Sequence, residues 1–169
     1  MKNLGNFSYK LLNQAQKLFD LAVKANIKIA SAESCTGGLI ASLITEISGS
    51  SQIFERGFVV YSNLAKEQNL GVDAEILKQF GAVSEKVAKE MAIGAIKNSA
   101  ANISIAVTGI SGPDGGSDDK PVGLVYISSF NNLNKKLIVK KFNFSGSRSE
   151  NRILTVQNAF KILISQIND

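Results

Sequence analysis

Short apolar strand patterns alternate with helical patterns along almost the whole chain, and the last two strand patterns follow one another directly. Alternation of this kind predicts parallel strands joined by crossover helices. The final pair is separated only by the turn Asn131–Asn134, which favours an antiparallel hairpin. We therefore expect an α/β fold, a three-layer α/β/α sandwich with a mixed sheet. The strand patterns are Ile27–Ala30, Gly57–Tyr61, Ile103–Val107, Val122–Phe130 and Leu137–Phe144.

The segments between the strands carry apolar residues at the three- and four-residue spacing of amphipathic helices. No linker, internal repeat or low-complexity stretch interrupts the 169 residues, a length typical of one domain. We therefore predict a single domain over residues 1–169. The helical segments are Tyr9–Ala25, Leu39–Ile47, a short helix capped by Ser62, Ala74–Phe80, a helix from Ser84 to about Lys97, and Arg148–Ile167.

The chain contains no histidine and one cysteine, Cys35. Ser-His-Asp and Cys-His catalysis and histidine or thiolate zinc sites are thereby excluded, and we expect neither a metal nor a cofactor. A lone cysteine forms no internal disulfide, which agrees with a reducing compartment. The N-terminal stretch Met1–Gln16 lacks an apolar signal core, and no apolar run reaches membrane-spanning length. These features predict a cytoplasmic protein without a membrane partner.

The formal net charge is +5, and its lysines are scattered instead of forming a dense stripe. This distribution disfavours nucleic acid as a partner and fits an anionic small molecule better.

Ser34 follows a strand pattern and is followed by Cys35, Thr36, Gly37 and Gly38 at the start of a helix. The N–H groups and the dipole at a helix N-terminus suit an oxyanion or a phosphate, and the glycines allow a ligand close to the backbone. The plainer interpretation is that Ser34 or Thr36 only caps the helix. Cys35 is a rival nucleophile, but without a histidine partner we expect a packed thiol.

Lys66 lies one helical turn after Ser62 and shortly after a strand that ends at Tyr61. A lysine acts as a general base when burial lowers its pKa, whereas most lysines are solvated. Both interpretations of Lys66 stay open from local sequence. For Tyr61 the default expectation is a ring in the core with its hydroxyl outward.

Two further segments suit an anionic ligand. The loop Thr108–Gly116 is rich in glycine after a strand, as in phosphate cradles, but it matches no standard phosphate motif and also reads as a surface turn. Arg148 and Arg152 lie in the first turns of the last helix, where a cation is unfavourable without an anionic partner. That partner is a phosphate or a carboxylate of a neighbouring subunit, and Arg152 also reads as a plain surface residue.

In their order, these motifs resemble the CinA C-terminal-domain family from about Leu11 to the C-terminus. The stretches that carry the resemblance are Ala32–Gly38, Phe54–Asn63 with Lys66, Gly81–Ser84, and Thr108–Gly116 with Lys120–Gly123. Members with two domains carry a further N-terminal domain similar to molybdopterin-binding proteins, so this chain resembles the stand-alone form. Where members often have Gly-Asp-Arg before the last helix, this chain has Gly146-Ser147-Arg148.

The resemblance implies an amidohydrolase that converts nicotinamide mononucleotide to nicotinate mononucleotide and ammonia. It implies Ser34 as nucleophile, Lys66 as base and Tyr61 as a supporting hydroxyl, with N–H groups of the following helix holding the oxyanion. It also implies a homodimer. The implied substrate-binding residues are Thr36, Gly37, Gly38, Thr108, Gly109, Ser111, Gly112 and Arg148.

Two other functions fit the same sequence. One is a nucleotide-binding or regulatory module without turnover, which has no need of both Ser34 and Lys66. The other is a DNA-associated competence role, whose signature is a steep loss of DNA affinity with salt.

Overall fold

The computed structural model describes residues 7–168. Residues 1–6, where part of the polar N-terminal stretch falls, and residue 169 lie outside the described residues. Within residues 7–168 no helix is both long and apolar enough to cross a membrane.

Five strands form one mixed sheet in the order β2-β1-β3-β4-β5. β1 pairs in parallel with β2 and β3, and β4 pairs antiparallel with β3 and β5. The predicted mixed sheet and C-terminal hairpin are therefore confirmed. The strands are β1 Ile29–Glu33, β2 Phe54–Val59, β3 Ile103–Gly109, β4 Leu124–Asn131 and β5 Lys136–Asn143.

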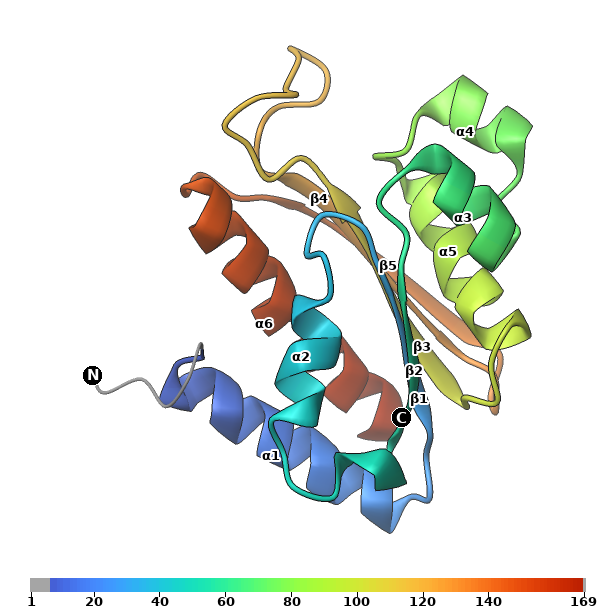
Figure 1. Ribbon diagram of the computed structural model, residues 1–169, viewed down its shortest axis with the longest axis vertical. Coiled ribbons are helices and arrows are strands. Elements are labelled where there is room, and N and C mark those ends of the chain that lie inside the picture. Colours follow the sequence, from blue (N-terminus) through green and yellow to red (C-terminus); the bar gives the residue numbers. More distant parts are fainter. Residues whose placement is uncertain (1–6, 169) are drawn as a thin grey trace.

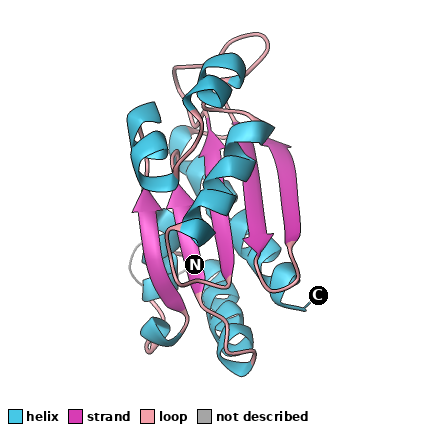
Figure 2. Ribbon diagram, turned by 90° about the vertical axis from the view of Figure 1, so that its right-hand side faces the viewer, coloured by secondary structure: helices cyan, strands magenta, loops and turns pink. Residues whose placement is uncertain are grey.

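Helices cover both faces of the sheet, as predicted for a three-layer sandwich (Figures 1 and 2). One apolar core lies between the sheet and α1, α2 and α6, and the other lies between the sheet and α3, α4 and α5. The helices are α1 Tyr9–Lys24, α2 Leu39–Thr45, the 3₁₀ turn η1 Ser50–Gln52, α3 Asn63–Leu70, α4 Ala74–Phe80, α5 Glu85–Lys97 and α6 Arg148–Asn168.

Most strand boundaries differ from those predicted by one to three residues, and two of these shifts have a clear local reason. β1 begins at Ile29 because Ile27 N–H still bonds the Ala22 carbonyl in the turn that ends α1. β2 ends at Val59 because the next two carbonyl oxygens, of Val60 and Tyr61, accept hydrogen bonds from the Lys66 amine.

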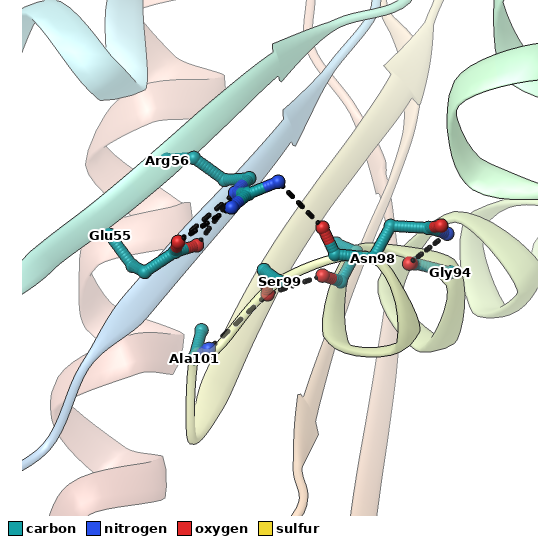
Figure 3. A network of polar contacts seen from close by, with 7 residues as sticks. Glu55, Arg56, Gly94, Asn98, Ser99 and Ala101 are labelled. Carbon is teal, nitrogen blue, oxygen red and sulfur yellow. Dashed lines mark hydrogen bonds and ion pairs between the residues drawn. The ribbon is translucent and has the colours of Figure 1, made fainter.

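β2 is an edge strand, and Arg56 ties it to the helical layer (Figure 3). The Arg56 guanidinium pairs with its neighbour Glu55 at 2.8 Å and donates to the Asn98 carbonyl at the end of α5 at 2.9 Å. The exposed ion pair itself contributes little to stability. The bond to Asn98 fixes where β2 lies relative to α5.

The carboxyl ends of β1, β2 and β3 meet at one edge of the sheet, with Glu33 paired to Val59 on one side and Val107 on the other. From β1 the chain crosses first to β2 and then to the opposite side, so the connections diverge between β1 and β3. In open α/β sheets ligands bind outside the carboxyl ends of the strands at such a point.

Candidate active site

Ser34 is the first residue after β1, at that edge of the sheet. Its backbone N–H donates to the Val107 carbonyl at 3.1 Å and so continues the β1–β3 ladder by one residue. Only 9% of the residue is exposed. The position of the Ser34 hydroxyl is therefore fixed by the two central strands and does not depend on a loose loop.

The amine of Lys66 lies beside that hydroxyl, with 3.1 Å between Lys66 Nζ and Ser34 Oγ. Ser62 caps α3 as predicted, accepting from Ala65 N–H, and places Lys66 on the first turn with its side chain directed inward. Lys66 is only 1% exposed, so the interpretation as a solvated surface lysine is wrong.

The partners of the Lys66 amine suit its neutral form. Besides Ser34 Oγ, Nζ lies 2.9 Å from the Val60 carbonyl oxygen and 3.3 Å from that of Tyr61. Nζ is placed to donate to all three oxygens. In the neutral amine two N–H donors are enough for the two carbonyls, which leaves the lone pair to accept the Ser34 hydroxyl proton. Burial lowers the pKa of the Lys66 amine below its ordinary value, because the charged form loses hydration. The arrangement can therefore activate Ser34 by general base catalysis.

The N-terminus of α2 is occupied by the chain's own carboxylate, that of Glu33. Glu33 is fully buried and its oxygens accept from the N–H groups of Gly38, Ile40 and Ala41 at 2.9–3.0 Å. The hydroxyls of Thr36 and Ser31 donate to the same carboxylate. Neither Ser34 nor Thr36 caps the helix. The prediction that these N–H groups of the helix hold an oxyanion is wrong, because the Glu33 carboxylate already occupies them.

Two other backbone donors lie next to Ser34. Within residues 7–168, the N–H groups of Cys35 and Thr36 have no oxygen acceptor. Both belong to the turn that starts at Ser34, so they are the donors nearest along the chain to the hydroxyl. The turn can therefore offer an oxyanion the two N–H groups that α2 itself cannot.

The glycines of this turn have the predicted backbone freedom. Gly37 has φ +60° and Gly38 has φ +97°, conformations that favour glycine. A Cβ on Gly38 would lie in ordinary contact with Val59, and one on Gly37 with the Arg152 guanidinium. The Thr36 side chain is fully buried and engaged with Glu33, so of the three predicted substrate-binding residues only the glycines face outward.

Cys35 is 6% exposed, and burial raises the pKa of its thiol to about 11. The thiolate is the nucleophilic form of cysteine, so a raised pKa leaves this thiol unreactive at neutral pH. The predicted packed thiol is confirmed.

The segment Thr108–Gly112 has mainly internal contacts. Thr108 Oγ1 donates to the Ala82 carbonyl at 2.8 Å, and a Cβ on Gly109 would come within 2.7 Å of the Leu124 carbonyl oxygen. Ser111 is buried, and its hydroxyl oxygen has no hydrogen-bond partner of standard geometry in the described chain. Gly112 has φ +88°, and its carbonyl oxygen faces Arg148. The segment predicted to bind the nucleotide therefore contacts Arg148 through Gly112, its last residue.

Arg148, the first residue of α6, joins this loop to the end of β2. Nη1 donates to the Gly112 carbonyl at 2.8 Å, and Nη2 lies 3.3 Å from the Tyr61 hydroxyl oxygen. Tyr61 is 62% exposed, so the predicted core position of its ring is wrong. Its carbonyl, not its hydroxyl, contacts Lys66. Arg148 and the Tyr61 ring therefore lie at the surface and are linked to Lys66 through the Tyr61 carbonyl, and we call them the rim of the site.

Glu33 and Asn151 received no role from the sequence, and Arg152 was left open between an anion-binding residue and a surface residue. Glu33 was visible as an acid ending an apolar strand, a signal for a buried, fully bonded carboxylate. Asn151 is fully buried in α6, and its amide nitrogen donates to the carbonyls of Ser111 and Gly146. Arg152 is half-buried, and Nη2 donates to the Thr36 carbonyl at 2.7 Å. The helical spacing placed Asn151 and Arg152 on α6 but gave no sign of their partners across the fold.

Two other features set the boundaries of the site. No group of three or more acidic or cysteine side chains within residues 7–168 could hold a metal ion. A cavity of about 740 Å³ lies between β5 and α6, lined by residues including Phe144, Ile153 and Leu154. Neither Ser34 nor Lys66 lines this cavity, so the cavity is separate from the candidate active site.

The sequence model of the CinA C-terminal domain matches residues 12–167. The chain belongs to the CinA C-terminal-domain family. Among curated relatives of this CinA domain, the putative competence-damage inducible protein of Acetivibrio thermocellus is 50% identical over 143 residues, covering 85% of the chain and 34% of the relative. That of Caldicellulosiruptor bescii is 44% identical over 170 residues, covering 99% of the chain and 41% of the relative. The chain thus spans less than half the length of these relatives.

Solved CinA structures have the same fold along almost the whole chain. The competence/damage inducible protein CihA of Agrobacterium tumefaciens has a TM-score of 0.95 at 42% identity, covering 98% of this chain and all of that one. A CinA superfamily protein of Escherichia coli has a TM-score of 0.87 at 31% identity, covering 97% of this chain and 95% of that one. The CinA sandwich is therefore confirmed independently of the sequence patterns.

Proposed function

We propose that this CinA domain is a nicotinamide-nucleotide amidase, which hydrolyses nicotinamide mononucleotide to nicotinate mononucleotide and ammonia. The observation that carries the proposal is the 3.1 Å contact between Ser34 Oγ and a lysine amine that is 1% exposed. A buried amine against a serine hydroxyl is costly, and it supplies the base that a chain without histidine otherwise lacks.

Ser34 Oγ attacks the carboxamide carbon, and its proton passes to Lys66 Nζ. The carbonyl oxygen gains negative charge, which the N–H groups of Cys35 and Thr36 stabilise in place of the N–H groups of α2. The carbon–nitrogen bond then breaks, and Lys66 returns the proton to the departing ammonia. Water attacks the resulting ester with Lys66 again as base, the acyl–oxygen bond breaks, and Ser34 recovers its proton. The cycle is balanced and uses no cofactor.

The anionic part of the substrate belongs at the rim. The Glu33 carboxylate fills the N-terminus of α2 and would repel a phosphate there. Arg148 is exposed and lies beside the Tyr61 hydroxyl, so its guanidinium is accessible to a phosphate that arrives from solvent. The Tyr61 ring offers a flat apolar surface for the pyridine ring. A homodimer and a cytoplasmic location belong to the same proposal.

The test is ammonia release from nicotinamide mononucleotide by the wild type, Ser34→Ala and Lys66→Met, the last chosen because methionine fills buried space without an amine. We expect each variant to lose at least about 10³-fold in kcat, as when a catalytic nucleophile or base is removed. Ser51→Ala and Lys161→Met, at exposed positions of η1 and α6, are the matched controls. Wild-type protein that binds the nucleotide but releases no ammonia would establish the binding module instead.

A further inference from the structure

Arg152 makes a contact that its place in the sequence does not explain. It lies on α6, yet its Nη2 donates to the carbonyl of Thr36, 116 residues earlier, within the turn that carries Ser34. Arg148, one turn before it, contacts Gly112 and Tyr61 instead. Among the described side chains of α6, Arg152 is therefore the one that bonds the Ser34 turn.

Among the described residues, the guanidinium of Arg152 has no anionic partner. The ion pairs between described residues are Arg56–Glu55 and Lys89–Glu85, and neither involves Arg152. The nearby carboxylate of Glu33 accepts five hydrogen bonds, none of them from arginine. Arg152 Nε is buried and has no acceptor among residues 7–168. A partly desolvated cation that forms no ion pair with a described residue therefore lies against the turn, which costs folding energy.

The position of this cation suits a negative charge that is present only during reaction. Arg152 lies close enough to Cys35 to favour a negative charge on its thiol, although the carboxylate of Glu33 opposes it there, so its field reaches the residue next to Ser34. A Cβ on Gly37 would be 3.6 Å from Arg152 Nη2, so the guanidinium packs directly beneath the turn. The Thr36 carbonyl is held by Arg152 and the Thr36 hydroxyl by Glu33, so the residue is fixed from both sides.

We propose that Arg152 is a positioning residue for the nucleophile: it holds the Ser34 turn through the Thr36 carbonyl, and its charge, which forms no ion pair with a described residue, favours the oxyanion formed there. The inference rests on the proposed amidase function for its substrate, but not for the reactivity of Ser34. Arg152 acts through the backbone of the turn and does not contact the substrate.

The experiment compares Arg152→Gln and Arg152→Lys with the control Lys161→Gln, which removes one charge from an exposed position of the same helix. Two rates are measured: ammonia release from nicotinamide mononucleotide, and covalent modification of Ser34 by phenylmethanesulfonyl fluoride, followed by mass spectrometry. In the second reaction Ser34 Oγ bonds to sulfur, fluoride leaves and Lys66 takes the proton, so no amide substrate is needed.

We expect Arg152→Gln to lower kcat and the modification rate by about 10- to 100-fold, the loss that follows a misplacement of about 1 Å, with KM nearly unchanged. Arg152→Lys should recover part of the loss because it keeps a charge and a donor. Lys161→Gln should match the wild type. If Arg152→Gln does not fold by circular dichroism, Arg152→Met replaces it.

Two results would overturn the inference. One is a raised KM with unchanged kcat, which would make Arg152 a substrate-binding residue. The other is modification of Ser34 in Arg152→Gln at the wild-type rate. Wild-type protein that releases no ammonia would refute the amidase proposal only, because the modification rates still decide the role of Arg152.

Discussion

Replacing Glu33 by glutamine should destabilise the protein by about 3 kcal/mol while leaving its shape almost unchanged. Glu33 Oε2 accepts from two backbone N–H groups of α2, and Oε1 accepts from one, that of Ala41. The amide of glutamine keeps one oxygen and turns the other into a donor. In its better orientation it leaves one buried N–H without an acceptor, at a cost of about 1–3 kcal/mol.

The loss of charge adds to this cost. The remaining bonds to Oε2 change from charge-assisted to neutral and lose about half their strength, and the interaction of the carboxylate with the α2 dipole, about 0.3–1 kcal/mol, is removed. The Ser31 and Thr36 hydroxyls can rotate and limit the damage. Glutamine avoids the desolvation cost of a buried carboxylate, which offsets part of these losses and leaves the expected destabilisation at about 3 kcal/mol.

The assay is urea unfolding followed by circular dichroism, with Glu46→Gln as the matched control. Glu46 is exposed at the other end of α2, and its replacement should change the free energy of unfolding by less than about 0.5 kcal/mol. A loss below about 1 kcal/mol in Glu33→Gln would refute the reasoning, since it would mean that the N-terminus of α2 does not depend on this carboxylate.

Four further outcomes follow from the same geometry. Because burial lowers the pKa of Lys66, kcat/KM should rise with pH to a plateau whose midpoint lies below that of an ordinary lysine, and a midpoint near 10.4 would exclude a buried base. The unfolded chain binds the Lys66 proton more tightly, so wild-type stability relative to Lys66→Met should fall as pH is lowered from about 10.4 to the folded-state pKa and then stay constant, as measured by urea titration. The Cys35 thiol, with its pKa raised to about 11, should resist iodoacetamide at pH 7 in the native protein and react after denaturation, while Cys35→Ala keeps most of the ammonia release. Gly109→Ala places a Cβ 2.7 Å from the Leu124 carbonyl oxygen and should cost about 1–3 kcal/mol in thermal or urea unfolding; an unchanged stability would show that β3 and β4 can separate there.

Patterns that repeat along the chain predicted the fold well. The strand–helix alternation, the Ser62 cap and the hairpin after Asn131 depend on neighbours in sequence, and the structure agrees at each. The pairing of Ser34 with Lys66 was implied by the resemblance to the CinA C-terminal-domain family, and the structure brings the two side chains together. Their chemical roles stay predictions.

Contacts between distant segments could not be predicted in the same way. Local sequence left the N-terminus of α2 either to a Ser34 or Thr36 cap or to an external anion, because an acid at the end of a strand does not show that its carboxylate will bond three N–H groups of the next helix. It gave Tyr61 a core position, because an aromatic residue at a strand end is usually buried, whereas this strand is at the edge of the sheet. Arg152 was indistinguishable from a surface arginine until α6 was packed against the Ser34 turn.

The edge position of β2 has a consequence for inactivation. Ser34 follows β1, a strand with neighbours on both sides, whereas Lys66 follows β2, which pairs with one strand, β1, and is tied to the end of α5 by the bond from Arg56 to Asn98. Separation of β2 from β1 would move the Lys66 amine away from Ser34 while the other four strands stayed paired. Activity should therefore be lost at a lower denaturant concentration than the far-ultraviolet circular dichroism signal. A substitution of Arg56 should increase the difference between these two concentrations.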